Sequence, residues 1–273
     1  MSKKEKNEMS FLGHLEELRW HLLRAFLSIF IIAIAAFIFH EIIFDKIILA
    51  PKTPGFFTNR MLCAFSEIVN VPALCINSNP FEIINIRMAG QFTTHIMVSI
   101  LTGIILAFPY IFFELWSFVK PALYSKEKGY TRGAVFFSSL LFLIGVLFGF
   151  FVITPLSVHF LGSYNVSDQV ENQINLTSYI STVASVTLAS GIIFELPVLV
   201  FFLTKIGLVT PSFLRKYRKH SIIAILLLSA IITPPDIFSQ VLVCFPLLFL
   251  YEIGIIISKR ILAKEKASFE EEG

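Results

Sequence analysis

Residues 88–113 read MAGQFTTHIMVSILTGIILAFPYIFF, a run that contains no Asp, Glu, Lys or Arg. A helix rises about 1.5 Å per residue, so a helix of this length can cross a hydrocarbon core of about 30 Å. Uncharged apolar runs longer than about 18 residues are typical of transmembrane helices. This stretch therefore predicts that the chain is a membrane protein.

The composition of the whole chain agrees with that reading. Of the 273 residues, 56% are hydrophobic, only 15% are charged and 30 are Phe, and the mean hydropathy is +0.78. Soluble domains carry roughly 25% charged residues, so this chain is neither disordered nor an ordinary soluble enzyme. The net charge of +3 is too small to suggest a nucleic-acid partner.

Similar runs recur along the chain and predict an all-α fold with six transmembrane helices in a single membrane domain. The expected segments are about Leu22–Ile43, Met88–Phe113, Gly133–His159, Leu176–Leu203, Ser221–Pro235 and Ile237–Ile257. The last two are short: fifteen helical residues rise about 22 Å. This hairpin must thin the bilayer locally or be shielded by protein, and a re-entrant loop is the alternative. We prefer a short crossing, because it leaves Lys259 and Arg260 on the same side as Lys219.

The positions of Lys and Arg predict the orientation. All but four of the 22 lie in the two termini or in the loops after the second and fourth segments. Cytoplasmic loops are the ones enriched in these residues, so we expect both termini in the cytoplasm. The domain then divides into a cytoplasmic terminus (1–21), a six-helix bundle (22–257) and a cytoplasmic tail (258–273). The four exceptions lie on the outer side: Lys46, Lys52, Arg60 and Arg87.

The first outer loop, Phe44–Arg87, is long for a loop with no structure of its own, and Phe81–Ile86 is apolar enough to lie on or against the membrane face. Cys63 and Cys75 both belong to it. A disulfide between them would contribute about 3 kcal/mol in the chain-entropy model, and two free thiols are the alternative. The third cysteine, Cys244, is expected to be a core residue.

Residues 10–23 read SFLGHLEELRWHLL and predict an amphipathic helix on the cytoplasmic membrane surface. Its apolar side chains recur at helical spacing, at Phe11, Leu15, Leu18 and Leu22, and Ser10 can cap its start.

We find no catalytic motif of the zinc-protease, serine-hydrolase, P-loop or dinucleotide type, so neither an enzyme, a metal nor a cofactor is expected. Glu195 is the clearest intramembrane charge, and Pro197 should kink its helix. The carboxyl group either faces a cavity or partner helix, which we favour, or is hydrogen-bonded inside the bundle.

Four motifs, in this order, resemble the TatC family, the large membrane subunits of the twin-arginine protein translocase. They are HLEELR (14–19), WSFVKPALYSKE (116–127), FELP (194–197) and TPPDIFSQ (233–240). The resemblance extends over essentially the whole chain. It implies a signal-peptide receptor and core subunit that exports folded proteins across the bacterial cytoplasmic (inner) membrane, driven by the proton gradient. The implied partners are twin-arginine signal peptides, single-span subunits of the TatA and TatB type, membrane lipid and further copies of the chain.

The resemblance also implies roles for individual residues. Two consecutive arginines in a signal peptide would pair with carboxylates, which match a guanidinium bidentately. The implied signal-peptide site contains Glu17, Arg19, Phe118, Pro121 and Glu127, with Glu127 as the main contact. Arg19 could pair with and orient Glu17, or hold a backbone carbonyl of the peptide. Without the motif, we would interpret Glu127 as a surface carboxylate that only balances the positive charges of Lys126 and Lys128.

Two further sets of residues follow from the resemblance. Glu195, Pro197 and Gln240 are expected to face a cavity or a partner helix, and Pro51 and Asp236 are expected to form an outer structural cap.

The chain departs from the family pattern at a few places, including His21, where relatives often carry Arg or Lys, and Lys52 and Lys120. Two other functions compete with the translocase. A small-solute transporter would need several polar groups at the midplane, and an intramembrane enzyme would need a nucleophile and a base.

Overall fold

The computed structural model describes residues 11–78, 81–119, 131–167, 169, 172–233 and 237–270. The long helices are α1 (Phe11–Ile38), α3 (Gly90–Val119), α4 (Thr131–Phe148), α6 (Leu176–Phe194), α9 (Arg218–Ile232) and α10 (Ile237–Glu270). The shorter helices are α2 (Phe57–Val69), α5 (Thr154–Ser163), α7 (Leu196–Lys205) and α8 (Pro211–Lys216). The remaining elements are π-helical turns η1 (Ile42–Ile48) and η6 (Gly149–Ile153), 3-10 turns η2 (Ala50–Lys52) and η3 (Pro72–Leu74), and strands β1 (Ile83–Ile84) and β2 (Ile174–Asn175).

The predicted helical membrane fold is confirmed. In the described ranges, five helical stretches are long and apolar enough to cross a bilayer: Gly13–Ile38, Gly90–Phe118, Gly133–Ser163, Leu176–Lys205 and Gln240–Ala263. The fifth predicted segment forms α9, which has only 15 residues, as its sequence indicated. The sixth continues well past its predicted end, because the tail is rich in Ala, Lys and Glu, which favour helix.

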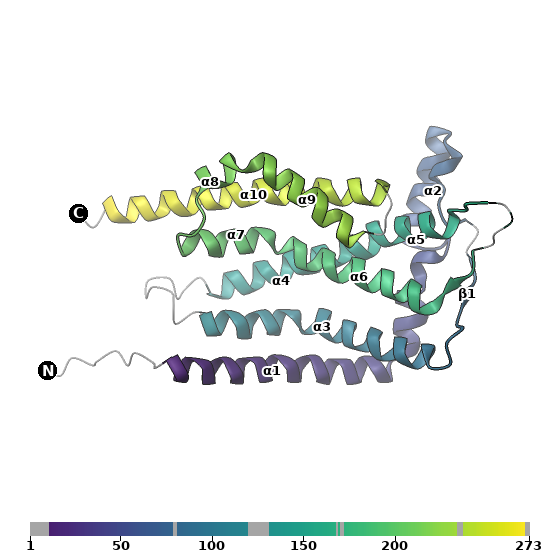
Figure 1. Ribbon diagram of the computed structural model, residues 1–273, viewed down its shortest axis with the longest axis horizontal. Coiled ribbons are helices and arrows are strands. Elements are labelled where there is room, and N and C mark those ends of the chain that lie inside the picture. Colours follow the sequence, from purple (N-terminus) through teal and green to yellow (C-terminus); the bar gives the residue numbers. More distant parts are fainter. Residues whose placement is uncertain are drawn as a thin grey trace.

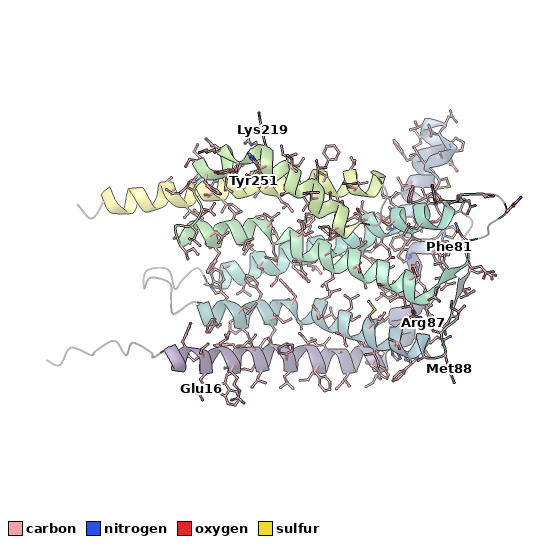
Figure 2. The ribbon with its side chains drawn as sticks, viewed as in Figure 1. Glu16, Phe81, Arg87, Met88, Lys219 and Tyr251 are labelled. Carbon is pink, nitrogen blue, oxygen red and sulfur yellow. A yellow bond between two sulfur atoms is a disulfide. The ribbon has the colours of Figure 1, made fainter. Side chains whose placement is uncertain are left out.

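The spans lie side by side, with α1 against α3, α4 against α6, and α10 against α7 (Figure 1). Helix α1 begins and α10 ends at the same end of the bundle. Glu16 lies at that end, whereas Arg87 and Met88 lie at the opposite one (Figure 2). This arrangement agrees with the predicted orientation, in which the two groups of charges lie on opposite sides of the membrane. We call the two ends inner and outer accordingly.

Small residues allow the helices to approach closely. A Cβ atom on Gly103 of α3 would lie 2.8 Å from the carbonyl oxygen of Ile29 in α1. A Cβ atom on Gly145 of α4 would lie 2.6 Å from the carbonyl oxygen of Ser190 in α6. Helices in a bilayer associate mainly through such close packing, because lipid is as apolar as their side chains.

Two cores hold the bundle together. One joins α6 and α7 to α9 and α10 around the fully buried Leu247. The other joins η1 and α5 to α3 and α6 around the equally buried Ile180. Beside this second core, β1 and β2 pair in parallel, with Ile83 opposite Ile174 and Ile84 opposite Asn175.

The outer segment 44–87 has regular structure of its own. It contains η1, η2, α2, η3 and β1, which cross the outer ends of the spans (Figure 1). Helix α2 carries apolar side chains at helical spacing (Phe57, Met61, Phe65, Ile68), a pattern that predicts a helix and that our prediction did not use. The structure joins Cys63 to Cys75 in a disulfide that ties α2 to the chain after it.

The N-terminal amphipathic segment is helical, as predicted, but it is not a separate helix on the membrane surface. Residues 11–23 form the first turns of α1, which continues unbroken to Ile38. Between His14 and Ile38 the chain has neither Gly nor Pro, so nothing in the sequence ends the helix where it meets the bilayer.

Candidate functional site

A buried carboxylate joins α1 to α3 near the inner end of the bundle. The Glu114 side chain of α3 is only 4% exposed, and its Oε2 atom lies 2.5 Å from Nδ1 of His21 and 3.4 Å from a guanidinium nitrogen of Arg24. Buried charges persist in proteins when they are paired and hydrogen-bonded. His21 and Arg24 come from the neighbouring helix, and the Tyr110 hydroxyl, one turn earlier on α3, also bonds to the Glu114 carboxylate. The contacts from His21 and Arg24 fix the rotation of α1 relative to α3.

One turn beyond Glu114, the Phe118 ring packs against the same face of α1. It stacks on His14 at a centroid distance of 4.3 Å and meets His21 edge-on at 6.2 Å. Glu17 lies between these two histidines on the helix, three residues after one and four before the other, so it belongs to the face that Phe118 covers. The Glu17 side chain is half-buried, whereas the neighbouring Glu16 is exposed. Two of the predicted signal-binding residues, Glu17 and Phe118, therefore lie together.

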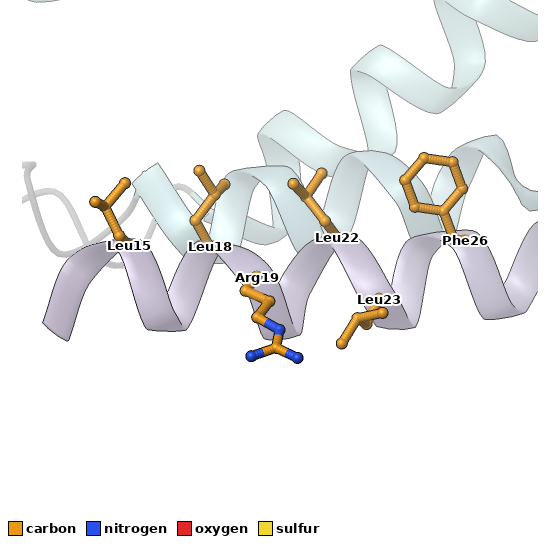
Figure 3. Close-up of a pocket in the computed structure, with 6 residues that line it drawn as sticks. All are labelled: Leu15, Leu18, Arg19, Leu22, Leu23 and Phe26. Atoms are coloured by element: carbon orange, nitrogen blue, oxygen red, sulfur yellow. The ribbon is translucent and has the colours of Figure 1, made fainter. Parts of the chain in front are cut away.

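Arg19 lies on another face of α1. It lines a shallow groove of about 310 Å³ with Leu15, Leu18, Leu22, Leu23 and Phe26. Figure 3 shows the groove between two rows of side chains, with Arg19 and Leu23 on one edge. The structure does not bring Arg19 to Glu17: no described carboxylate pairs with Arg19. Residues two apart on a helix point to different faces, which explains the separation.

The two other predicted signal-binding residues, Pro121 and Glu127, lie outside the described residues. Helix α3 ends at Val119 and α4 begins at Thr131, so the segment that carries both connects the inner ends of these two helices.

Glu195 stands where the fourth span breaks into α6 and α7, two residues before Pro197. The proline lacks an N–H group to continue the helix, and the break appears where the sequence predicted it. Ser138 of α4 donates a hydrogen bond of 2.7 Å to Oε2 of Glu195. The other carboxylate oxygen, Oε1, is buried and has no hydrogen-bond partner among the described residues. Oε2 thus fits the interpretation in which Glu195 is hydrogen-bonded inside the bundle, and Oε1 is free to accept a hydrogen bond from a partner.

The remaining predicted residues lie apart from both places. Gln240 of α10 donates to the carbonyl oxygen of Leu226 in α9 at 3.3 Å, and so bridges the short hairpin. The carbonyl oxygen of the buried Pro51 accepts hydrogen bonds from Asn59 and Asn77 at the outer end. Asp236 lies outside the described residues.

Sequence reasoning missed the Glu114 cluster. Glu114 follows directly after an apolar run of 26 uncharged residues, and an acid in such a place is a functional candidate by default. That signal was present in the sequence. Its partners on α1 could not be found in the same way, because only the packing of α1 on α3 brings His21 and Arg24 to it.

The fold and these sites define a multi-pass helical membrane protein whose inner face presents carboxylates and an arginine beside an apolar groove. Comparison with known families is more specific. The family model described as Sec-independent protein translocase protein (TatC) matches residues 13–246. The chain belongs to the TatC family, whose members are components of a protein translocase.

Individual relatives cover nearly the whole chain. The protein named Sec-independent protein translocase protein TatC from Blattabacterium sp. subsp. Periplaneta americana is 40% identical over 258 residues, 94% of this chain and 97% of its own. TatCy of Bacillus subtilis is 32% identical and covers 98% of this chain and 96% of its own. A crystal structure titled Twin Arginine Translocase Receptor- TatC in DDM superposes with a TM-score of 0.70 at 32% identity, over 90% of this chain and 99% of that one.

Proposed function

We propose that this chain is the receptor and core subunit of a twin-arginine translocase in the bacterial cytoplasmic membrane. In this role it captures the signal peptides of folded cargo at its inner face, and export is driven by the proton gradient. The observation that carries the proposal is the placement of the half-buried Glu17 on the α1 face that Phe118 covers. Family membership and the structural likeness to a twin-arginine translocase receptor support it.

The chemistry of capture rests on two carboxylates. Arginine keeps its charge at any physiological pH and presents a planar fork of N–H donors that matches a carboxylate. Glu17 would hold one guanidinium of the signal, and Glu127, on the segment between α3 and α4, would hold the other. Phe118 offers a ring on which a guanidinium can stack. Because Glu114 fixes α1 against α3, Glu17 and Phe118 keep their spacing before a signal arrives, and this limits the entropy lost on binding.

The groove beside Arg19 suits the next part of a signal peptide. Secretory signals carry an apolar stretch after their charged region. The groove is lined mainly by leucines and follows α1 from its inner end toward the bilayer (Figure 3). An apolar stretch lying there would bury its side chains against Leu22 and Phe26, while Arg19 at the groove edge contacts backbone carbonyls of the peptide.

The test is photo-crosslinking of a twin-arginine signal peptide to the full chain in membrane vesicles. We expect the double variant Glu17→Gln/Glu127→Gln to lose at least about tenfold in crosslinking, since hydrogen bonds between charged groups contribute about 1.5–3 kcal/mol each. Glu16→Gln is the matched control, because Glu16 is the exposed neighbour of Glu17 on the same helix. Full crosslinking by an inserted double variant would refute the assignment.

Glu195 gives the proposed translocase a contact inside the membrane. Oε1 of Glu195 has a free acceptor site in a low-dielectric environment, where a polar group gains from any partner that can donate to it. We assign this oxygen to a polar side chain on the transmembrane helix of a single-span subunit of the TatA or TatB type, with several copies of the chain joining such subunits in one complex.

A further inference from the structure

Helix α2 carries a continuous apolar face that no other described part of the chain covers. Its side chains Phe57, Met61, Phe65 and Ile68 are 60%, 59%, 53% and 79% exposed. Their spacing of four, four and three residues places them on one side of the helix. The charged residues of α2, Arg60 and Glu67, are also exposed but lie together on a different side, so the helix is amphipathic.

The start of α2 is fixed to the bundle. Thr58 donates a hydrogen bond to the carbonyl oxygen of Phe151, and the ring of Phe56 stacks on that of Phe151 at a centroid distance of 5.3 Å. The buried Asn59 donates to the carbonyl oxygens of Pro51 and Thr53 at 2.9 and 2.7 Å. These contacts determine the direction in which the rest of the helix leaves the bundle.

The far half of α2 is held by the chain that follows it. Cys63 is joined to Cys75, and Ser66 donates to the carbonyl oxygen of Val71 at 2.7 Å. Asn70 ends the helix in the left-handed conformation, with φ of 55°, so that the chain turns back at once. The helix that carries the exposed apolar face is therefore held in place along its whole length, by the bundle at its start and by the following chain at its end.

The direction and depth of α2 point to what covers this face. The helix runs crosswise to the spans and projects past the side of the bundle (Figure 1). Its anchor, Phe151, belongs to the span Gly133–Ser163, whose uncharged part begins directly after Arg132 on the inner side. Eighteen residues separate Gly133 from Phe151, a helical rise of about 27 Å. With the inner edge of a hydrocarbon core of about 30 Å placed at Gly133, α2 lies at the level of the outer boundary.

We propose that α2 is an interfacial anchor whose Phe57–Met61–Phe65–Ile68 face lies among the acyl chains and glycerol groups of the outer leaflet. A helix that lies in the interface plane buries its apolar face at this boundary and keeps its charges toward water, as the separation of Arg60 and Glu67 from the apolar face allows. The occupant of the face is lipid, because the face continues sideways, at bilayer depth, from spans that are long and apolar enough to cross a bilayer. The anchor would hold the outer end of the bundle at a fixed height in the membrane.

The test is spin-label accessibility in the full chain reconstituted in phosphatidylethanolamine–phosphatidylglycerol vesicles. Single cysteines replace Met61, Phe65 or Glu67 in a Cys244→Ala background, with the Cys63–Cys75 disulfide kept oxidised. We expect nitroxides at positions 61 and 65 to collide severalfold more often with oxygen, which concentrates in lipid, than with the water-soluble complex of nickel with ethylenediaminediacetate. A nitroxide at position 67 is the matched control and should show the opposite preference.

Two outcomes would overturn the proposal. A nickel preference at positions 61 and 65 equal to that at 67 would mean that the face is bathed in water. Low collision rates with both reagents would mean that protein, from a partner or from a second copy, covers it. Retention of the disulfide and of detergent-extracted yield in each labelled variant checks that α2 is still folded.

Discussion

Glu114 shows how a single carboxylate can be tolerated inside an otherwise apolar helix. His21 and Arg24 on α1 and Tyr110 on α3 all bond to its oxygens, and the free energy that these contacts contribute offsets the cost of burying the charge. The two contacts from α1 also align the two helices. Arg24 is about half-exposed and remains hydrated, whereas His21 is 18% exposed. The short hydrogen bond between His21 and Glu114 is therefore the contact that is shielded from water. It should contribute most of the free energy with which this cluster joins α1 to α3.

We predict that Glu114→Gln and His21→Gln are not additive. Each change removes one side of the buried contact, so the double variant should be more stable than the sum of the single effects by about 0.5–3 kcal/mol, the range for contacting pairs. The measurement is a double-mutant cycle on thermal or denaturant unfolding in detergent. A coupling free energy within error of zero would mean that the two side chains do not interact in solution.

A second residue-scale prediction separates the two oxygens of Glu195. Ser138→Ala removes the hydrogen bond to Oε2 and should lower the unfolding free energy by about 1 kcal/mol while leaving co-purification of single-span subunits unchanged. Glu195→Leu removes Oε1 as well, and should reduce that co-purification. Equal co-purification with both variants would contradict the proposed role of Oε1.

At the scale of elements, the packing of α4 on α6 depends on the absence of a side chain at Gly145. An alanine there would place Cβ 2.6 Å from a backbone oxygen and 2.7 Å from Cβ of Phe194, so α4 has to shift. We predict that Gly145→Ala destabilises the protein by about 1–3 kcal/mol, the usual effect of overpacking. Gly133 is the matched control in the same helix, because a Cβ there meets nothing within 4 Å.

In the control, Gly133→Ala should be neutral or stabilising, since alanine is the better helix former by about 1 kcal/mol. Unfolding of both variants in the same detergent provides the comparison. If Gly145→Ala were as stable as Gly133→Ala, the close approach of α4 and α6 would not exist in solution.

The disulfide that joins α2 to the chain after it gives a further prediction at the scale of elements. Replacing Cys63 and Cys75 by Ala should increase hydrogen exchange in α2 and in the residues up to 75, because closing this short loop is worth about 3 kcal/mol. Amide exchange in α6 should not change, since its core lies elsewhere. Unchanged exchange in α2 would mean that its contacts with the bundle suffice to hold it.

The elements that could be predicted from sequence are those in which hydrophobicity and length act alone. The spans and the short α9 were predicted in this way, and the break before Pro197 was predicted from the missing N–H group of proline. Helix α2 was missed because the outer segment was treated as one loop, although the spacing of Phe57, Met61 and Phe65 indicates a helix. The candidate site near the inner end could be predicted only in part. The motif resemblance identified Glu17 and Phe118, but the pairing of His21 with Glu114 arises only from tertiary packing.

At the scale of the whole molecule, the spans have unequal lengths. Helix α9 has 15 residues and rises about 22 Å, whereas α3 has 30 and rises about 45 Å. A bilayer with a core of about 30 Å cannot match both, and the longer helix can extend into water more easily than the shorter one can leave its ends in lipid. Arg218 at the start of α9, paired with Glu252 at 2.9 Å, holds that end of the hairpin near the interface.

We therefore predict that the protein is most stable in thin bilayers. In phosphatidylcholine vesicles of increasing acyl-chain length, the melting temperature should fall as the core grows beyond the reach of α9, because each added ångström of mismatch raises the free energy by a fraction of a kcal/mol. Inserting four apolar residues within α9 should move the optimum to longer lipids, whereas the same insertion in the last turns of α10 should not. A melting temperature that rose steadily with chain length would show that neighbouring protein, and not a thinned membrane, accommodates the short hairpin.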